Sequence, residues 1–211
     1  GHCNLKENIF LKFVLNFTIL NLRWAFLKKN SVEEENFIIQ KIKDPQTRDY
    51  GFNLLVKAYK QRVYWLVRKM VIDHDDTNDL TQDIFIKVYQ NLDRFREESK
   101  LFTWIYRIAV NESISFLRIK RRKYMIPIYD VERELIGKVD SGKGISGSEI
   151  EIKLQKAILT LPEKQRLVFN MKYFEDLSYE QMAEITGTSV GALKASYHHA
   201  VKKIEELLTN D

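Results

Sequence analysis

Aromatic side chains crowd around cationic residues in the stretch KLFTWIYRIAVN, residues 100–111. Phe102, Trp104 and Tyr106 occupy alternate positions there, a polar segment (FREES) comes just before, and the basic run RIKRRK follows at Arg118–Lys123. Planar rings beside cations can stack nucleobases and neutralise phosphates, which is the chemistry of a surface for single-stranded nucleic acid. Packing in a hydrophobic core is the alternative interpretation of each aromatic residue, and solvation is the alternative for the basic run.

Helices are the elements that must position these side chains. The chain has 211 residues with only 8 Gly and 3 Pro, and long stretches rich in Leu, Ile, Lys, Glu and Gln favour helix. On a helix, Trp104 shares one side with Ile105 and Ile108, whereas Phe102 and Tyr106 share another. We therefore expect an all-α fold in which most of these aromatics pack a core.

A second helix is predicted from DLTQDIFIKVYQNL, where Leu80, Ile84, Val88 and Leu92 recur every four residues. The opposite face carries polar residues: Asp79, Gln82, Asp83 and Gln90. An earlier helix follows from the apolar stripe within residues 54–67, and the acidic stretch DHDDTND is expected to be the turn between the two. No second histidine stands at helical ligand spacing from His74, so a solvated loop is preferred to a metal site.

The C-terminal part contains a predicted helix-turn-helix. Glycine and serine gather in residues 126–148, which is typical of a flexible linker, and helical periodicity resumes at Glu149. Pro162 suits a first helical position, Ser178 and Gln181 form a capping box, and Gly187 is a helix stop. The next helix would enter the DNA major groove, with a generic helical hairpin as the alternative. Its outward face offers Lys194, Ser196, His198 and His199.

Composition narrows the class of protein. The hydrophobic content is 45%, the charged content is 30% and the formal net charge is +5, which fits a folded chain with separate basic and acidic patches. A lone Cys3 allows no internal disulfide and fits a cytoplasmic location. Residues 9–27 are apolar but interrupted by Lys12 and Arg23 among other polar residues, so they make a poor membrane span. No catalytic motif is present, and we expect neither an enzyme nor a cofactor, metal or small-molecule substrate.

Two long segments carry a family resemblance. DLTQDIFIKVYQNLDRFREESKLFTWIYRIAVNESISFLRIKRRK and, downstream, LPEKQRLVFNMKYFEDLSYEQMAEITGTSVGALKASYHHAVKKI resemble a bacterial RNA polymerase sigma factor of the two-domain extracytoplasmic-function group. The resemblance covers about residues 33–208. It implies an N-terminal extension (1–30), a region 2 domain (31–126), a linker (127–148) and a region 4 helix-turn-helix domain (149–211).

The resemblance also implies partners and site residues. Core RNA polymerase would be bound through Asp79, Gln82 and Asp83, and the chain would direct promoter-specific transcription initiation. A pocket for a base flipped from the promoter −10 element would comprise Phe95, Arg96, Glu97, Ser99, Trp104 and Asn111. This chain departs from many relatives in having Glu97 and Glu98 where they have Gly and Asp. DNA phosphates would be met by Arg118, Lys120, Arg121 and Arg122. The −35 element would be read by Lys194, Ser196, His198 and His199, and Lys202 would also contact the −35 DNA.

An anti-sigma factor is a common further partner in this group. Two other interpretations stay open at this point. One is an autonomous helix-turn-helix regulator that binds duplex DNA alone, which leaves the acidic helix without a role. The other is a membrane-associated interaction protein anchored by residues 9–27.

Overall fold

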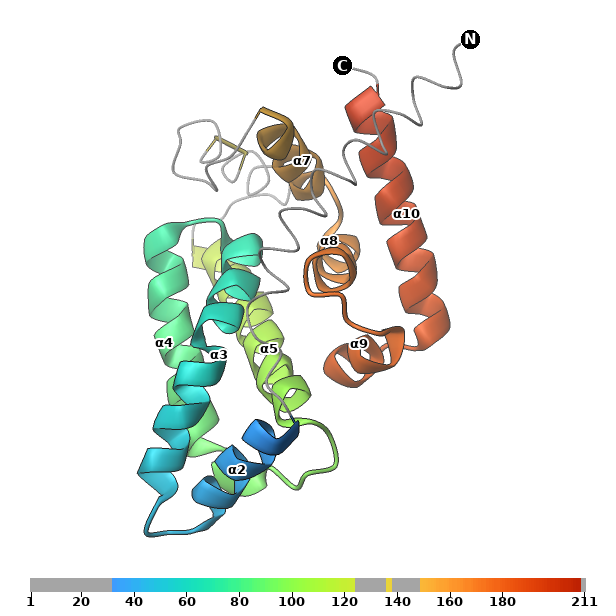
Figure 1. Ribbon diagram of the computed structural model, residues 1–211. Helices are drawn as coiled ribbons and strands as arrows, with labels where there is room; N and C mark the ends of the chain where they lie inside the picture. Colours follow the sequence, from blue (N-terminus) through green and yellow to red (C-terminus); the bar gives the residue numbers. More distant parts are fainter. Residues whose placement is uncertain (1–31, 124–135, 138–148, 210–211) are drawn as a thin grey trace.

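The computed structural model describes residues 32–123, 136–137 and 149–209, and every regular element within these ranges is helical (Figure 1). The all-α prediction is confirmed. Residues 1–30 and nearly all of the expected linker lie outside the described residues. Within the described residues, no helix is both long and apolar enough to cross a membrane. The elements are α2 (Val32–Lys43), α3 (Arg48–Val71), α4 (His74–Gln90), η1 (Leu92–Arg94), α5 (Leu101–Lys123), α7 (Glu149–Leu159), α8 (Glu163–Phe169), η2 (Asn170–Phe174), α9 (Tyr179–Thr186) and α10 (Val190–Thr209).

Helices α2 to α5 form an N-terminal group around a shared apolar core. The predicted face of α4 is buried in it, since Ile84 and Val88 are fully covered and Leu80 is 6% exposed. Gly51 permits the close approach of α2 to α3, because a Cβ at this position would lie 2.6 Å from the backbone nitrogen of Ile42. The N-terminal group is thus a tight bundle with one long face of α4 left for other contacts.

The predicted acidic turn is wrong, because most of this stretch is the first two turns of α4. Only Ile72 and Asp73 lie between α3 and α4. The Asp73 side chain accepts hydrogen bonds from the backbone N–H groups of Asp75 and Asp76, and so caps the helix. Carboxylates at a helix N-terminus are also favoured by the helix dipole. Acidic composition therefore marks a helix start here rather than a loop.

Helices α7 to α10 form a C-terminal group with its own apolar cluster, which includes Leu154, Ile158 and Phe169. The capping box of Ser178 and Gln181 is present at the start of α9. Gly187 ends α9 in a left-handed conformation with φ 67°, as a helix stop requires. Pro162 stands at the N-cap of α8 instead of its first turn, one position earlier than predicted. The helix-turn-helix of α9 and α10 is therefore formed as expected.

The two groups share a continuous core. Met171, Met182 and Ile185 of the C-terminal group belong to the same buried cluster as Leu101 and Ile105 of the N-terminal group. Helix α5 lies between the rest of its bundle and helices α8 and α9 (Figure 1). Between α8 and α9, η2 is a single π-helical turn. The two groups therefore lie against each other in one closed arrangement.

Candidate nucleic-acid interface

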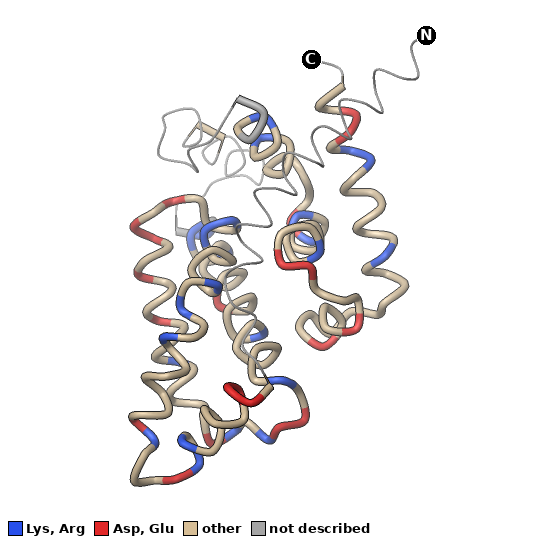
Figure 2. Tube along the Cα trace, viewed as in Figure 1, with Lys and Arg blue, Asp and Glu red and all other residues tan. Residues whose placement is uncertain are grey.

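The outer face of α4 carries the residues predicted to dock on polymerase. Asp79, Gln82 and Asp83 are all exposed, and acidic residues recur along this helix (Figure 2). Two apolar side chains share this exposed side, since Ile86 is 55% and Tyr89 38% exposed. An acidic stripe with an apolar end is a surface that suits a protein partner with basic and apolar groups.

The FREES segment connects η1 to α5 in a loop that bends at residues 97–99. Phe95 is half-buried and its ring packs against Trp104, with ring centroids 5.3 Å apart. Arg96 is exposed and Ser99 is half-buried. Glu97 adopts a left-handed backbone with φ 60° and forms an ion pair with Lys43 of α2. A left-handed backbone favours glycine. Glu97 adopts it at a position where, by the resemblance, many relatives have Gly.

Helix α5 resolves the choice between core and surface for its aromatics. Phe102 is 7% exposed and Tyr106 is fully buried, so both pack the core. Trp104 is half-buried and borders a surface hollow. The N-terminus of α5 is fixed by Glu35 of α2, whose carboxylate accepts a hydrogen bond of 2.6 Å from the Leu101 N–H. One aromatic of the three is therefore available to a ligand.

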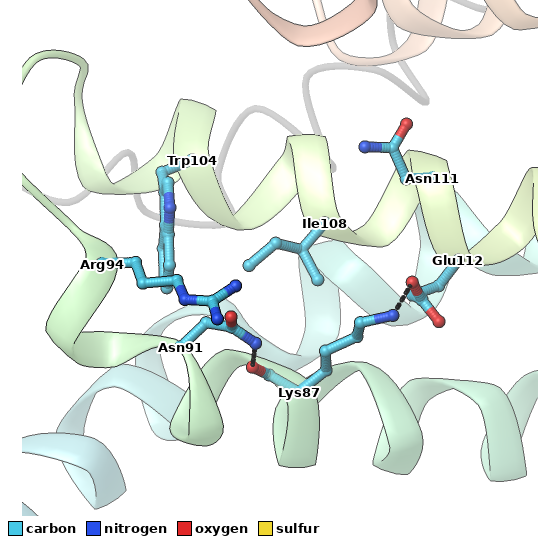
Figure 3. A pocket seen from close by; sticks show the side chains of 7 residues that line it. All are labelled: Lys87, Asn91, Arg94, Trp104, Ile108, Asn111 and Glu112. Atoms are coloured by element: carbon cyan, nitrogen blue, oxygen red, sulfur yellow. Dashed lines mark hydrogen bonds and ion pairs between the residues drawn. The ribbon is translucent and has the colours of Figure 1, made fainter.

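A hollow of about 270 Å³ lies between α5 and the end of α4 (Figure 3). This is near the lower end of ligand-pocket volumes, which suits one small planar group. Lys87 crosses it to form an ion pair with Glu112, at 2.5 Å. Its lining residues are Lys87, Asn91, Arg94, Trp104, Ile108, Asn111 and Glu112.

Of the six residues predicted for the base pocket, Trp104 and Asn111 line this hollow. Phe95 supports Trp104 from behind, while Arg96, Glu97 and Ser99 are not among the lining residues. The signal that could have found the others is helical spacing. Lys87, Asn91 and Arg94 recur at intervals of four and three residues, as do Trp104, Ile108 and Asn111.

The cations at the basic end of α5 differ in exposure and in pairing. Arg118 and Arg122 are exposed, as a phosphate-binding role requires. Lys120 is instead half-buried and forms an ion pair of 2.6 Å with Asp76 of α4. The side chain of Arg121 lies outside the described residues. Arg118 and Arg122 are therefore better placed than Lys120 to meet DNA.

Helix α10 presents its predicted reading face to solvent. Lys194, His198, His199 and Lys202 are exposed, whereas Ser196 is half-buried. The opposite side packs inward through Leu193, Ala200 and Ile204, which are 1%, 0% and 4% exposed. The Ser189 hydroxyl accepts a hydrogen bond from the Ala192 N–H and fixes the start of the helix. The first turns of α10 are thus rigidly mounted and accessible, as in a helix that reads a DNA groove.

Comparison with known families agrees with this arrangement. Residues 55–123 match the model of Sigma-70 region 2, and residues 151–204 match that of Sigma-70, region 4. The chain is 31% identical over 188 residues to the ECF RNA polymerase sigma factor SigW of Bacillus subtilis, covering 82% of this chain and 98% of that one. It is 34% identical to the ECF RNA polymerase sigma-E factor of Escherichia coli (strain K12), covering 74% of this chain and 85% of that one.

Solved structures show the same fold. The sigma factor RpoE from Bartonella quintana, solved in complex with the anti-sigma factor NepR, matches with a TM-score of 0.59 and 25% identity, over 76% of this chain and 98% of that one. CnrH, solved in complex with the cytosolic domain of CnrY, matches with a TM-score of 0.62 and 21% identity, over 84% of this chain and 99% of that one. The chain therefore belongs to the extracytoplasmic-function (ECF) group of RNA polymerase sigma factors, which act with RNA polymerase in promoter-directed transcription initiation.

Proposed function

We propose that this sigma factor docks on core RNA polymerase through α4, captures a flipped −10 base beside α5 and reads the −35 element with α10. The region 2 domain would span residues 31–126 and the region 4 domain residues 149–211, with residues 127–148 as the linker. The observed element order supports this division, because α5 ends at Lys123 and α7 begins at Glu149.

The hollow beside Trp104 is the observation that carries the proposal. It combines one half-buried indole ring, an exposed amide at Asn111 and two cations, Lys87 and Arg94. A ring can stack an unpaired base, an amide can bond to its edge, and cations can neutralise the flanking phosphates. Arg94 forms no ion pair with any side chain that the structure describes, so it is available for a phosphate.

Magnitudes indicate why polymerase must assist. Unstacking duplex DNA costs about 1.4 kcal/mol per step, so a bubble of about ten steps costs about 14 kcal/mol. A stacked base returns about 1–3 kcal/mol, and phosphate contacts add a salt-dependent contribution. The isolated chain should therefore fail to melt promoter DNA stably. Stable melting of a duplex promoter by the purified chain would contradict this part of the proposal.

The base-capture step can be tested with polymerase holoenzyme and fork-junction DNA. Asn111→Ala should weaken binding to a fork that carries the flipped −10 base by about 5- to 150-fold, which corresponds to the loss of about 1–3 kcal/mol from a specific base contact. Against a fork with an abasic site at that position, wild type and Asn111→Ala should bind equally. Asn53→Ala, an exposed asparagine on α3, serves as the matched control. An equal loss of affinity on both forks would show that Asn111 does not contact the base.

Docking is tested separately by co-elution with core RNA polymerase. Asp83→Arg should abolish co-elution while leaving helicity unchanged, because Asp83 is exposed and reversal of its charge opposes the partner. Co-elution of Asp83→Arg at the wild-type level would remove α4 from the docking surface. We also propose an anti-sigma partner, since the RpoE relative was solved bound to the anti-sigma factor NepR.

A further inference from the structure

The contact between the two helical groups contains a buried charged network. Lys69 of α3 forms an ion pair of 3.2 Å with Glu175, which follows η2, and their side chains are 9% and 11% exposed. The Tyr106 hydroxyl donates a hydrogen bond of 2.8 Å to the second oxygen of the same carboxylate. The Lys69 ammonium also lies 4.1 Å from the centre of the Phe174 ring. Phe174 and Glu175 of the C-terminal group thus contact Lys69 and Tyr106 of the N-terminal group.

Apolar contacts surround this network and continue it. Met171 and Leu177, which flank Phe174 and Glu175 in sequence, are buried in the core shared with α5. Three residues after Lys69, at the C-cap of α3, Ile72 is fully buried in a cluster with Leu159 of the C-terminal group. Burial of the network lowers the pKa of Lys69 and raises that of Tyr106.

The closed protein is too small to contact both promoter elements at the same time. Elements centred at −35 and −10 are about 25 base pairs apart, or about 85 Å along B-DNA at about 3.4 Å per pair. A compact chain of this length has a radius of gyration of about 17 Å and is therefore about 45 Å across. Asp83, Asn111 and His198 are all exposed in the closed arrangement, so each of these three residues stays accessible in it. It prevents only their simultaneous use on one DNA.

We propose that Lys69, Tyr106 and Glu175 form a latch that holds the two helical groups closed, and that this latch opens when the chain engages a promoter. The closed state itself rests on the contacts described above, and the opening step rests on the proposed function. The Glu175 carboxylate is buried and bonds to both the Lys69 ammonium and the Tyr106 hydroxyl. A change at Glu175 breaks both interactions and should therefore shift the equilibrium between the closed and open arrangements. The latch therefore sets how much of the free protein is open.

The latch can be tested in the free full-length chain by fluorescence energy transfer. Labels are placed at Lys57→Cys on α3 and Glu206→Cys on α10, both exposed, in a Cys3→Ser background. Glu175→Gln should reduce the ratio of closed to open molecules on the order of 100-fold and lower the transfer. Glu184→Gln, which removes an exposed carboxylate from α9, is the matched control and should leave transfer unchanged.

Loss of transfer in Glu175→Gln with wild-type helicity supports the latch, and unchanged transfer overturns it. If helicity is lost as well, a second comparison decides. Lys69→Met removes one partner of the ion pair and Glu175→Gln removes the other. If the two residues act together as a latch, the double variant Lys69→Met/Glu175→Gln should lose no more transfer than the more strongly affected single variant. Losses of transfer that add up in the double variant would overturn the latch. These measurements contain neither polymerase nor DNA, so they stand or fall separately from the docking and base-capture experiments.

Discussion

The cap that Glu35 places on α5 gives a prediction whose size can be worked out. Helix α5 begins at Leu101, and its first N–H groups have no partner within the helix. Glu35 lies 66 positions earlier, on α2, and its carboxylate accepts from the Leu101 N–H at 2.6 Å. Glu35→Ala removes this partner and leaves a part-buried N–H group without its acceptor.

The expected cost is about 1–2 kcal/mol in the free energy of unfolding. Hydrogen bonds to charged groups contribute about 1.5–3 kcal/mol, and removal of a helix cap costs about 0.5–2 kcal/mol. Glu35 is half-buried, so solvent screening places the value towards the lower end. Its position in the first turn of α2 adds an interaction with the dipole of that helix, worth about 0.3–1 kcal/mol.

Urea denaturation of Glu35→Ala beside Glu33→Ala separates the two contributions. Glu33 is exposed in the same first turn of α2, so both variants lose a carboxylate near that helix dipole. Only Glu35→Ala loses the cap, and it should be less stable than Glu33→Ala by about 1 kcal/mol. Hydrogen exchange at the Leu101 amide should also accelerate only in Glu35→Ala. Equal stabilities and equal exchange in the two variants would refute the cap.

Three further predictions concern other elements. Gly51→Ala should destabilise the fold by about 1–3 kcal/mol, because the new Cβ meets the α2 backbone. Gly191→Ala should be neutral or stabilising, because a Cβ at this position has open space around it. Thermal unfolding of the two variants distinguishes these outcomes. Burial raises the pKa of Tyr106 well above 10.0, so its hydroxyl stabilises the fold fully below pH 10.0 and less as pH rises through the raised pKa. The stability difference between wild type and Tyr106→Phe should therefore shrink by up to about 1.4 kcal/mol per pH unit above about pH 10 in urea titrations. Lys202→Ala should weaken −35 DNA binding evenly across sequences and lower the slope of log affinity against log salt by about 1, and a sequence-dependent loss would contradict a phosphate contact.

Local patterns in the sequence predicted the elements and their buried faces well. The four-residue recurrence of Leu80, Ile84 and Val88 identified the core face of α4, because a helical period is a local property. The capping box of Ser178 and Gln181 likewise depends on only four consecutive residues. The acidic stretch after Asp73 was misread because carboxylates are common both in loops and at helix starts, and only the cap geometry separates the two.

Contacts between distant residues could not be predicted from the sequence. Lys87 and Glu112 meet only because α4 and α5 pack side by side, so most of the hollow was missed. Lys69 and Glu175 are separated by 106 positions, and neither stands in a pattern that distinguishes it from the other charged residues of its helix or loop. The partner that each of these residues contacts is set by tertiary packing, and no short stretch of the sequence reveals it.

The π-helical turn at Asn170–Phe174 lets the chain change in length at one place while keeping its contacts. A π turn accommodates one residue more than the same stretch of α-helix, so the segments on either side of it keep their rotational phase. Deleting one residue there would restore α-helical winding and leave everything that follows at nearly the same angle around the helix axis. In a regular α-helix such as α3, the same deletion would rotate everything that follows by about 100°. A one-residue deletion within η2 should thus disturb the contact of Glu175 with Lys69 less than a one-residue deletion within α3.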